Sequence, residues 1–75
     1  MSYHFYSIIV PSYNRADEIK ELLSSIEQLD FPREKFEVII SDDGSTDDTA
    51  QIVSQFQKKE IYQLKYNIQK NRAIY

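Results

Sequence analysis

The chain has 75 residues, a net charge of −3, no cysteine and one histidine, His4. This length allows one small domain, whose single core typically supplies only about 3–5 kcal/mol of stability. The composition excludes a disulfide framework and a zinc site of Cys and His ligands, and the acidic balance argues against a protein that binds nucleic acid. No stretch reaches the ~18–20 apolar residues of a membrane span, and the N-terminus lacks the apolar region of a signal peptide, so we expect a cytoplasmic protein.

Three short, mostly apolar runs predict β-strands, at residues 5–10, 36–41 and 61–66. The first two have the near-continuous apolar character of strands that are buried in a parallel sheet, and β-branched residues favour the extended backbone. The third run alternates less strictly. The pattern therefore predicts three strands.

A helix is predicted between the first two strands, because apolar residues recur there at helical spacing: Ile19, Leu22, Leu23, Ile26 and Leu29. We expect Asn14 to cap its N-terminus. Pro32 should end it near residues 29–30, because a proline disfavours helical geometry in the residue before it.

A second helix is predicted after Gly44, the single glycine of the chain, with an apolar stripe formed by Ala50, Val53 and Phe56. We expect Ser45 to cap this helix, and Asp47 and Asp48 to lie in its first turn, where carboxylates interact favourably with the helix dipole.

Strand and helix alternate, so the predicted fold class is α/β, with two βαβ units and a parallel sheet. If the strands lie side by side in the order 3-2-1, both helices cover the same face of the sheet. The other face then exposes apolar side chains, and we expect self-association through them. The residues concerned are Phe5, Ile8, Ile9 and Ile39.

Ligands of open parallel sheets bind at the carboxyl ends of the strands, which here are followed by residues 11–15 and 42–48. Neither a G-x-G-x-x-G nor a P-loop motif is present. Three uses of these turns stay open. A carboxylate can accept a hydrogen bond from a nucleobase while Tyr13 stacks on the base; Asp42 and Asp43 can bind Mg²⁺ or accept a phosphoryl group in a small regulatory domain; or the polar residues only cap helices.

The sequence Val-Pro-Ser-Tyr-Asn-Arg (10–15), followed by Val-Ile-Ile-Ser-Asp-Asp-Gly-Ser-Thr-Asp-Asp-Thr (38–49), resembles the start of a glycosyltransferase family 2 domain. The resemblance covers residues 5–60 and implies the GT-A fold, a Rossmann-like α/β fold of enzymes that use nucleotide sugars.

The resemblance implies that these two turns bind the nucleotide of the sugar donor. Pro11 and Tyr13 would line the base pocket, and Asp42 or Asp43 would accept from the ring N–H of a uracil-type base. Asp43 is the first choice because it heads the turn. Arg15 occupies a position where many relatives have an acid, so no role is carried over to it.

The family's metal-binding segment and catalytic base lie further downstream, so the resemblance assigns no catalytic residue and no metal ligand to this chain. It implies a family 2 enzyme that uses Mg²⁺ or Mn²⁺ and moves a sugar, expected from a UDP-sugar, to an acceptor hydroxyl. Residues 67–75 are compatible with the start of the next family segment. We expect residues 1–75 to be a partial GT-A domain that is inactive alone.

Overall fold

The computed structural model describes residues 4–69, so residues 70–75 of the expected next segment lie outside the described part. In chain order the elements are β1 (Tyr6–Ser12), α1 (Ala16–Glu27), a short 3₁₀ helix η1 (Arg33–Lys35), β2 (Phe36–Asp42), α2 (Thr49–Lys59) and β3 (Gln63–Ile68). Both predicted helices and all three predicted strands are present.

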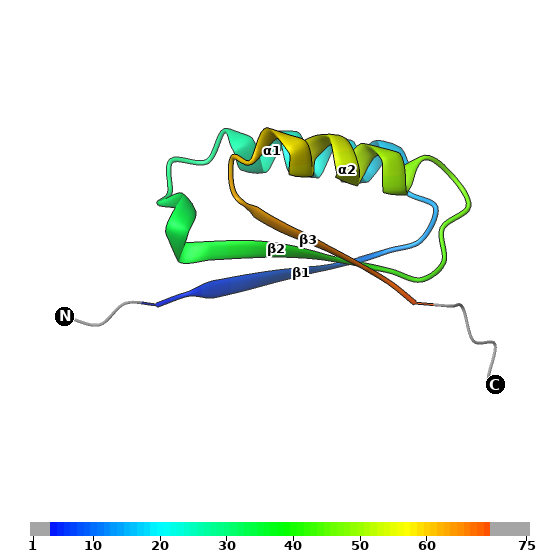
Figure 1. The fold of residues 1–75 in the computed structure, drawn as a ribbon, viewed down its shortest axis with the longest axis horizontal. Helices are drawn as coiled ribbons and strands as arrows, with labels where there is room; N and C mark the ends of the chain where they lie inside the picture. The colour runs from blue at the N-terminus through cyan, green and yellow to red at the C-terminus, as the bar shows by residue number, and fades with distance from the viewer. Residues whose placement is uncertain (1–3, 70–75) are drawn as a thin grey trace.

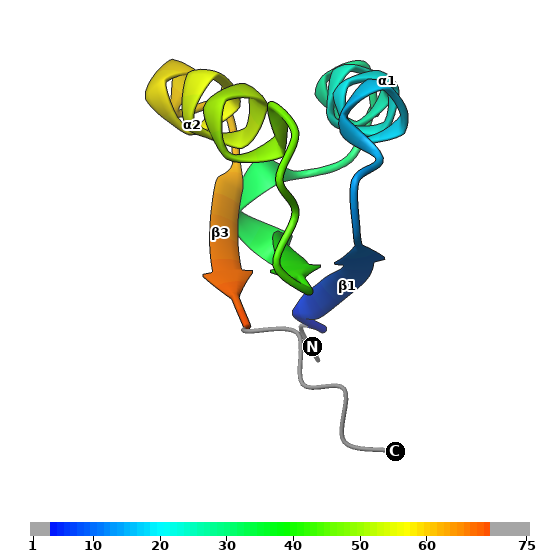
Figure 2. The same cartoon turned by 90° about the vertical axis from the view of Figure 1, so that its right-hand side faces the viewer.

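The three strands form one parallel sheet in the order β1-β2-β3. Both helices lie on one side of it, as Figure 1 shows. Seen end-on, α1 lies above β1 and α2 above β3 (Figure 2). The predicted α/β class is confirmed, the strands have the order 3-2-1 that was considered, and both helices then lie on one face as expected. The opposite face of the sheet has no helix from residues 4–69.

The bounds of β1 and α1 differ from those expected. β1 continues through Pro11 to Ser12, because an edge strand tolerates a proline whose missing N–H needs no partner strand. α1 already ends at Glu27. The Arg33 guanidinium accompanies this early end: it donates to the carbonyl oxygens of Ile26 (3.0 Å) and Glu27 (2.6 Å), and the Ile26 carbonyl also accepts from the Leu29 N–H (3.1 Å).

The third strand lies two residues further along than predicted, at Gln63–Ile68. α2 is followed by Glu60 in the left-handed conformation (φ 53°), whose N–H donates to the carbonyl of Gln57 (3.2 Å). This left-handed residue turns the chain back toward the sheet and delays the start of β3.

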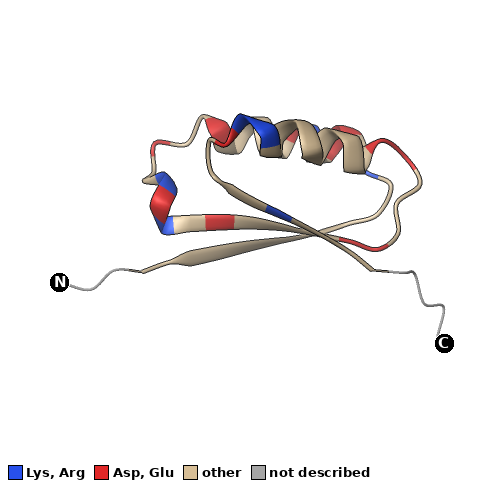
Figure 3. Ribbon diagram, viewed as in Figure 1, with Lys and Arg blue, Asp and Glu red and all other residues tan. Residues whose placement is uncertain are grey.

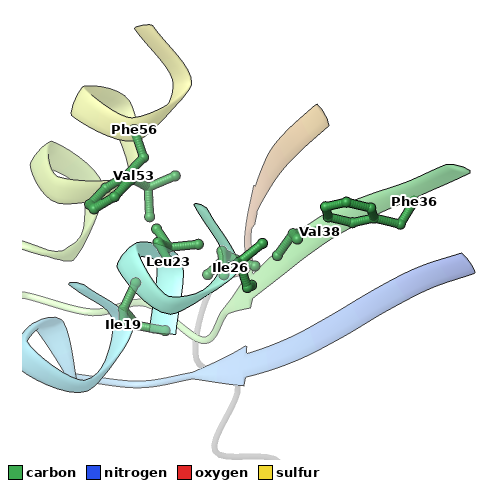
Figure 4. Close-up of a cluster of buried hydrophobic side chains, with 8 residues drawn as sticks. Ile19, Leu23, Ile26, Phe36, Val38, Val53 and Phe56 are labelled. Carbon is green, nitrogen blue, oxygen red and sulfur yellow. The ribbon is translucent and has the colours of Figure 1, made fainter. Parts of the chain in front are cut away.

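The core lies between the central strand and the two helices (Figure 4). Alternate residues of β2 face the helices, where most residues of the two predicted stripes meet them; Leu29, which lies beyond α1, and Ala50 are exposed. The buried apolar side chains are Ile19, Leu23, Ile26, Phe36, Val38, Ile40, Val53 and Phe56. Complete burial of one such side chain typically stabilises a fold by about 1.5–3 kcal/mol, so this cluster supplies most of the hydrophobic stabilisation.

The open face of the sheet is partly apolar, as expected, with Phe5 54% and Ile9 65% exposed. The prediction for Ile8 is wrong: Ile8 pairs with the buried Val38, so it lies on the helix face, and it stays 37% exposed because β1 is an edge strand. None of the helices within residues 4–69 is long and apolar enough to cross a bilayer.

Polar side chains occupy the middle of the open face and contact one another there. The Ser7 hydroxyl donates to Glu37 (2.6 Å), and the ammonium of Lys65 lies 3.0 Å from the same carboxylate. The hydrogen bond from Ser7 and the contact with Lys65 lower the pKa of Glu37. These contacts connect side chains of all three strands across the face that the helices leave open.

Candidate functional site

Two turns meet at the carboxyl edge of the sheet, one between β1 and α1 and one between β2 and α2 (Figure 1). They meet because β1 and β2 are parallel and pair in register up to Ser12 and Asp42. Acidic residues gather along the second turn (Figure 3). This edge is where an open parallel sheet binds ligands.

Asp42, the last residue of β2, is 1% exposed, and both of its carboxylate oxygens are hydrogen-bonded. Its Oδ1 accepts from the Ser45 N–H (3.1 Å) and the Ser45 hydroxyl (2.5 Å). Its Oδ2 accepts from the Tyr66 hydroxyl of β3. Asp42 therefore joins the second turn to the third strand.

Ser45 and Asn14 tie the two turns to each other. The Asn14 N–H donates to the Ser45 hydroxyl oxygen (2.7 Å), and the Asn14 side-chain oxygen accepts from the Thr46 N–H (2.8 Å). Asn14 has φ 52°, a left-handed conformation that asparagine tolerates better than most residues. Each turn thus holds the other through its backbone.

The expected capping roles of Asn14 and Ser45 are therefore wrong. The residue before α1 is Arg15 and the residue before α2 is Asp48, and neither makes a side-chain capping hydrogen bond. The physical reason is competition: both predicted capping residues use their side-chain oxygens between the turns, where they satisfy backbone N–H groups of loops.

Asp47 also lies outside the helix, since α2 begins at Thr49. One oxygen of its carboxylate accepts from the N–H (3.1 Å) and hydroxyl (2.5 Å) of Thr49, and the other accepts from the N–H of Ala16 (3.1 Å) at the start of α1. The hydrogen bonds from Thr49 are the main cause of its lowered pKa. Asp47 is thus a further link between the turns rather than a residue of the first helical turn, as the sequence analysis expected.

Three of the predicted nucleotide-binding residues lie exposed at this edge: Pro11, Tyr13 (47% exposed) and Asp43. The Asp43 backbone N–H donates to the Ser12 carbonyl (2.9 Å). Within residues 4–69 its carboxylate has no hydrogen-bond or ion-pair partner, so it remains available to a ligand. The fourth predicted residue, Asp42, is the buried one.

Gly44 follows Asp43 with φ 85°. This left-handed conformation costs a glycine nothing and most other residues about 1–2 kcal/mol. The single glycine of the chain therefore lies where the backbone must turn back from Asp43 to Ser45. In doing so it allows the Ser45 N–H to reach Asp42.

The acidic turn does not fit a metal ion. A divalent cation such as Mg²⁺ takes several oxygen ligands, whereas both oxygens of Asp42 are engaged by protein donors and Asp43 offers one exposed carboxylate. No group of three or more His, Cys, Asp or Glu side chains that could hold a metal occurs in the described part of the chain. This geometry argues against the alternative in which Asp42 and Asp43 bind Mg²⁺.

Tyr66 is a site residue that the sequence analysis did not single out. Burial and the neighbouring Asp42 raise the pKa of its hydroxyl above the ordinary value, consistent with its role as a hydrogen-bond donor to that carboxylate. One sequence feature could have indicated it: Tyr66 lies in phase with Leu64, so both side chains belong to the helix face of β3, where Asp42 of the neighbouring strand also lies.

A shallow hollow of about 410 Å³ lies at the opposite edge of the sheet, beside Arg33 and Tyr62. Its polar groups serve the fold: Arg33 binds the end of α1, and the Tyr62 hydroxyl donates to the Leu23 carbonyl (3.1 Å). Burial raises the pKa of Tyr62 to about 12, with Glu27 contributing. We therefore place the candidate site at the carboxyl edge.

Comparison with known proteins gives a family match over residues 7–74, to the sequence model of "Glycosyl transferase family 2". A poly(ribitol-phosphate) beta-N-acetylglucosaminyltransferase, TarS of Staphylococcus aureus, is 50% identical over 54 residues, which are 72% of this chain and 9% of TarS. Glycosyltransferase AglE of Haloferax volcanii is 40% identical over 52 residues, 69% of this chain and 17% of AglE.

Two solved structures resemble the fold closely. A mannosyltransferase from Pyrobaculum calidifontis, solved with GDP-Man and Mn²⁺, has a TM-score of 0.85 and 32% identity over 97% of this chain and 21% of its own. S. aureus TarS 1-349, solved with UDP-GlcNAc, has a TM-score of 0.81 and 41% identity over 91% of this chain and 19% of its own.

The chain spans about a tenth to a fifth of the length of these relatives. Within that span, the two polar turns and the parallel sheet that support them have the arrangement of a GT-A glycosyltransferase. The match extends over nearly the whole chain, and the chain belongs to glycosyl transferase family 2.

Proposed function

We propose that the carboxyl edge of this sheet binds the nucleotide of a sugar-nucleotide donor. The protein to which the chain contributes would transfer a sugar, expected from a UDP-sugar, to an acceptor hydroxyl. Tyr13 stacks on the base, Pro11 borders it, and Asp43 accepts a hydrogen bond from its ring N–H. These roles follow from the family resemblance and from the exposure of the three residues.

The observation that carries the proposal is the difference in environment between the adjacent carboxylates of Asp42 and Asp43. Asp42 is buried and fully hydrogen-bonded, whereas Asp43 is exposed and its carboxylate is unpartnered within residues 4–69. We therefore assign Asp42 to the scaffold and Asp43 to the ligand. An exposed carboxylate next to an exposed aromatic ring is a suitable receptor for a flat base with a hydrogen-bond donor on its edge.

A carboxylate acceptor at Asp43 restricts which nucleobases this edge can recognise. Uracil and guanine each carry a ring N–H that can donate to a carboxylate, whereas neutral cytosine and adenine present a ring nitrogen that only accepts. The relatives solved with nucleotides contain UDP-GlcNAc and GDP-Man, both of the first kind. We expect UDP because the relative that is more similar in sequence was solved with a uridine nucleotide.

The remaining chemistry is not assigned to residues of this chain. The Mn²⁺ in the mannosyltransferase structure supports a divalent cation, Mg²⁺ or Mn²⁺, for the whole enzyme. We propose no metal ligand and no catalytic base among residues 4–69, and expect the 75 residues alone to transfer no sugar. The cytoplasmic location stays a prediction from the sequence.

Isothermal titration of the 75-residue chain with UDP and with CDP tests the proposed site. UDP should bind more tightly than CDP, and both Asp43→Asn and Tyr13→Ala should weaken UDP binding by about tenfold, the typical value of one charged hydrogen bond or one stacked base.

Asp48→Asn is the matched control, because it removes an exposed carboxylate of the same turn that makes no capping hydrogen bond. Tyr13→Phe keeps the ring and should retain affinity. Equal loss for Asp43→Asn and Asp48→Asn would show a general charge effect, and the proposed contact would then be abandoned.

A further inference from the structure

The hydrogen bonds at the carboxyl edge reach one residue further than the two turns. The Tyr66 hydroxyl, on β3, donates to Asp42 Oδ2. Through Oδ1 the same carboxylate holds Ser45, whose hydroxyl oxygen accepts from the Asn14 N–H. We call this series Tyr66, Asp42, Ser45 and Asn14 the strand-to-turn relay.

Two members of the relay, Asp42 and Asn14, are neighbours in the chain of proposed ligand contacts. Asp42 immediately precedes Asp43 in the chain, and Asn14 immediately follows Tyr13. Asn14 is further held by its side-chain oxygen, which accepts from the Thr46 N–H (2.8 Å). The relay therefore fixes the backbone on both sides of the site without occupying the ligand-facing side chains.

Because the Asp42 carboxylate is buried, the loss of one of its hydrogen bonds is costly. Asp42 is 1% exposed, so any oxygen that loses its donor stays away from water. The neighbouring Ser12, which pairs with Asp42 in the sheet, is 5% exposed, and its own hydroxyl oxygen has no hydrogen-bond partner within residues 4–69. Without the Tyr66 hydroxyl, Asp42 Oδ2 loses its donor, and the side chain of Asp42 or of Ser12 must rearrange to replace it. We expect Asp42 to shift and Asp43, the next residue, to shift with it.

We propose that Tyr66 is a positioning residue for base selection, which acts through Asp42 and Ser45 to set the spacing between Tyr13 and Asp43. The inference rests on the proposed nucleotide function of this edge. A stacked ring tolerates small displacements because every base has a flat face, whereas the hydrogen bond to a ring N–H depends on distance and angle. Loss of the relay therefore reduces the preference for UDP over CDP more than it reduces nucleotide binding in general.

The test compares two tyrosines that each lose one hydroxyl. Tyr66→Phe removes the donor to Asp42, and Tyr62→Phe removes the donor to the Leu23 carbonyl at the opposite edge of the sheet. Both changes keep the ring, and the urea midpoint of each variant measures their cost to stability. Tyr66→Phe should reduce the ratio of UDP to CDP affinity about five- to tenfold, the range of one lost hydrogen bond, and Tyr62→Phe should leave it unchanged.

A second measurement needs no nucleotide. In ¹H–¹⁵N spectra, Tyr66→Phe should shift the amide signal of Asn14 and speed its hydrogen exchange, because the bond from that N–H to Ser45 is the third hydrogen bond of the relay, counted from Tyr66. Tyr62→Phe should leave the Asn14 amide signal in place. An unchanged Asn14 signal in Tyr66→Phe contradicts the relay, even if that variant is less stable.

The outcomes separate this inference from the proposed function. If UDP binding depends on Asp43 but both Tyr→Phe variants keep the wild-type preference for UDP, the site stands and the relay is rejected. If the wild-type chain does not prefer UDP over CDP, the proposed site and the role of Tyr66 in base selection are both rejected.

Discussion

Asp42 and Asp43 are adjacent in the chain but lie in opposite environments: the first is 1% exposed with both oxygens hydrogen-bonded, and the second is exposed. The alternation of β2 produces this difference, because Asp42 continues the helix-facing series of Phe36, Val38 and Ile40. One carboxylate thus belongs to the interior and its neighbour to solvent.

The first prediction is that Asp42 and Asp43 contribute differently to the stability of the fold. Asp42→Asn replaces one acceptor oxygen with an NH₂ group that faces existing donors, so we expect a loss of about 1–3 kcal/mol in the free energy of unfolding. Asp43→Asn should change it by less than about 0.5 kcal/mol, as is usual for an exposed side chain. Urea denaturation measures both, and equal effects would contradict the assignment of Asp42 to the scaffold.

The two left-handed residues give a second prediction. Glu60 (φ 53°) ends α2 and Asn14 (φ 52°) lies between the turns. Glu60→Gly should raise the free energy of unfolding by about 0.5–1 kcal/mol, because glycine adopts this conformation without strain and the change removes a negative charge from a helix C-terminus.

Asn14→Gly is the matched control for that gain. It also relieves the left-handed backbone but deletes the side-chain oxygen that accepts from Thr46. We expect no gain in its urea midpoint, and an equal gain for both glycine variants would show that the side chain of Asn14 contributes nothing to holding the turns.

The lowered pKa of Glu37 leads to a prediction of how the free energy of unfolding depends on pH. Its folded-state pKa lies below the ordinary value of 4.5, so the folded state prefers the ionised form. This contribution is fully present above pH 4.5 and is lost as the pH falls through the lower folded-state pKa. Urea midpoints at pH 6 and pH 3 should therefore converge more closely in Glu37→Gln than in the wild type. Glu21→Gln, an exposed change on α1, should behave as the wild type.

Much of the fold could be predicted because the core is built from regular apolar stripes. Leu23 of α1 and Val53 of α2 lie in stripes that the sequence shows directly, and both are fully buried. The strand order that was considered, 3-2-1, is the one observed, and both helices then lie on one face because βαβ crossovers are right-handed. The bounds of α1 were less predictable, because its early end depends on Arg33, a residue outside the helix.

The site was only partly predictable. Exposure of Tyr13 and Asp43 agrees with their expected roles, although their contact with a nucleotide stays a prediction. The expected caps failed because side-chain oxygens of Asn14 and Ser45 have partners in the opposite turn, some thirty residues away. Local sequence patterns do not report such long-range partners; for Tyr66 the alternation of β3 indicates the face on which it lies but not its hydrogen bond to Asp42.

Self-association through the open face of the sheet stays a proposal, and it gives a further prediction. Ile9 is 65% exposed there beside Ile39, its partner on β2. If apolar contact drives association, sedimentation of the 75-residue chain should show a mass that rises with concentration, and Ile9→Lys should restore the monomer. Leu29→Lys, an equally polar change at a residue 47% exposed beyond α1, should not. A concentration-independent monomer would refute the proposal.

The most direct test of the central claim is an intermolecular nuclear Overhauser measurement on the chain with bound UDP. We predict cross-peaks between the uracil H5 and H6 protons and the ring protons of Tyr13, together with a downfield uracil N3–H signal that disappears in Asp43→Asn. Uracil cross-peaks to residues away from the carboxyl edge, such as Tyr62 beside the opposite hollow, would contradict the account.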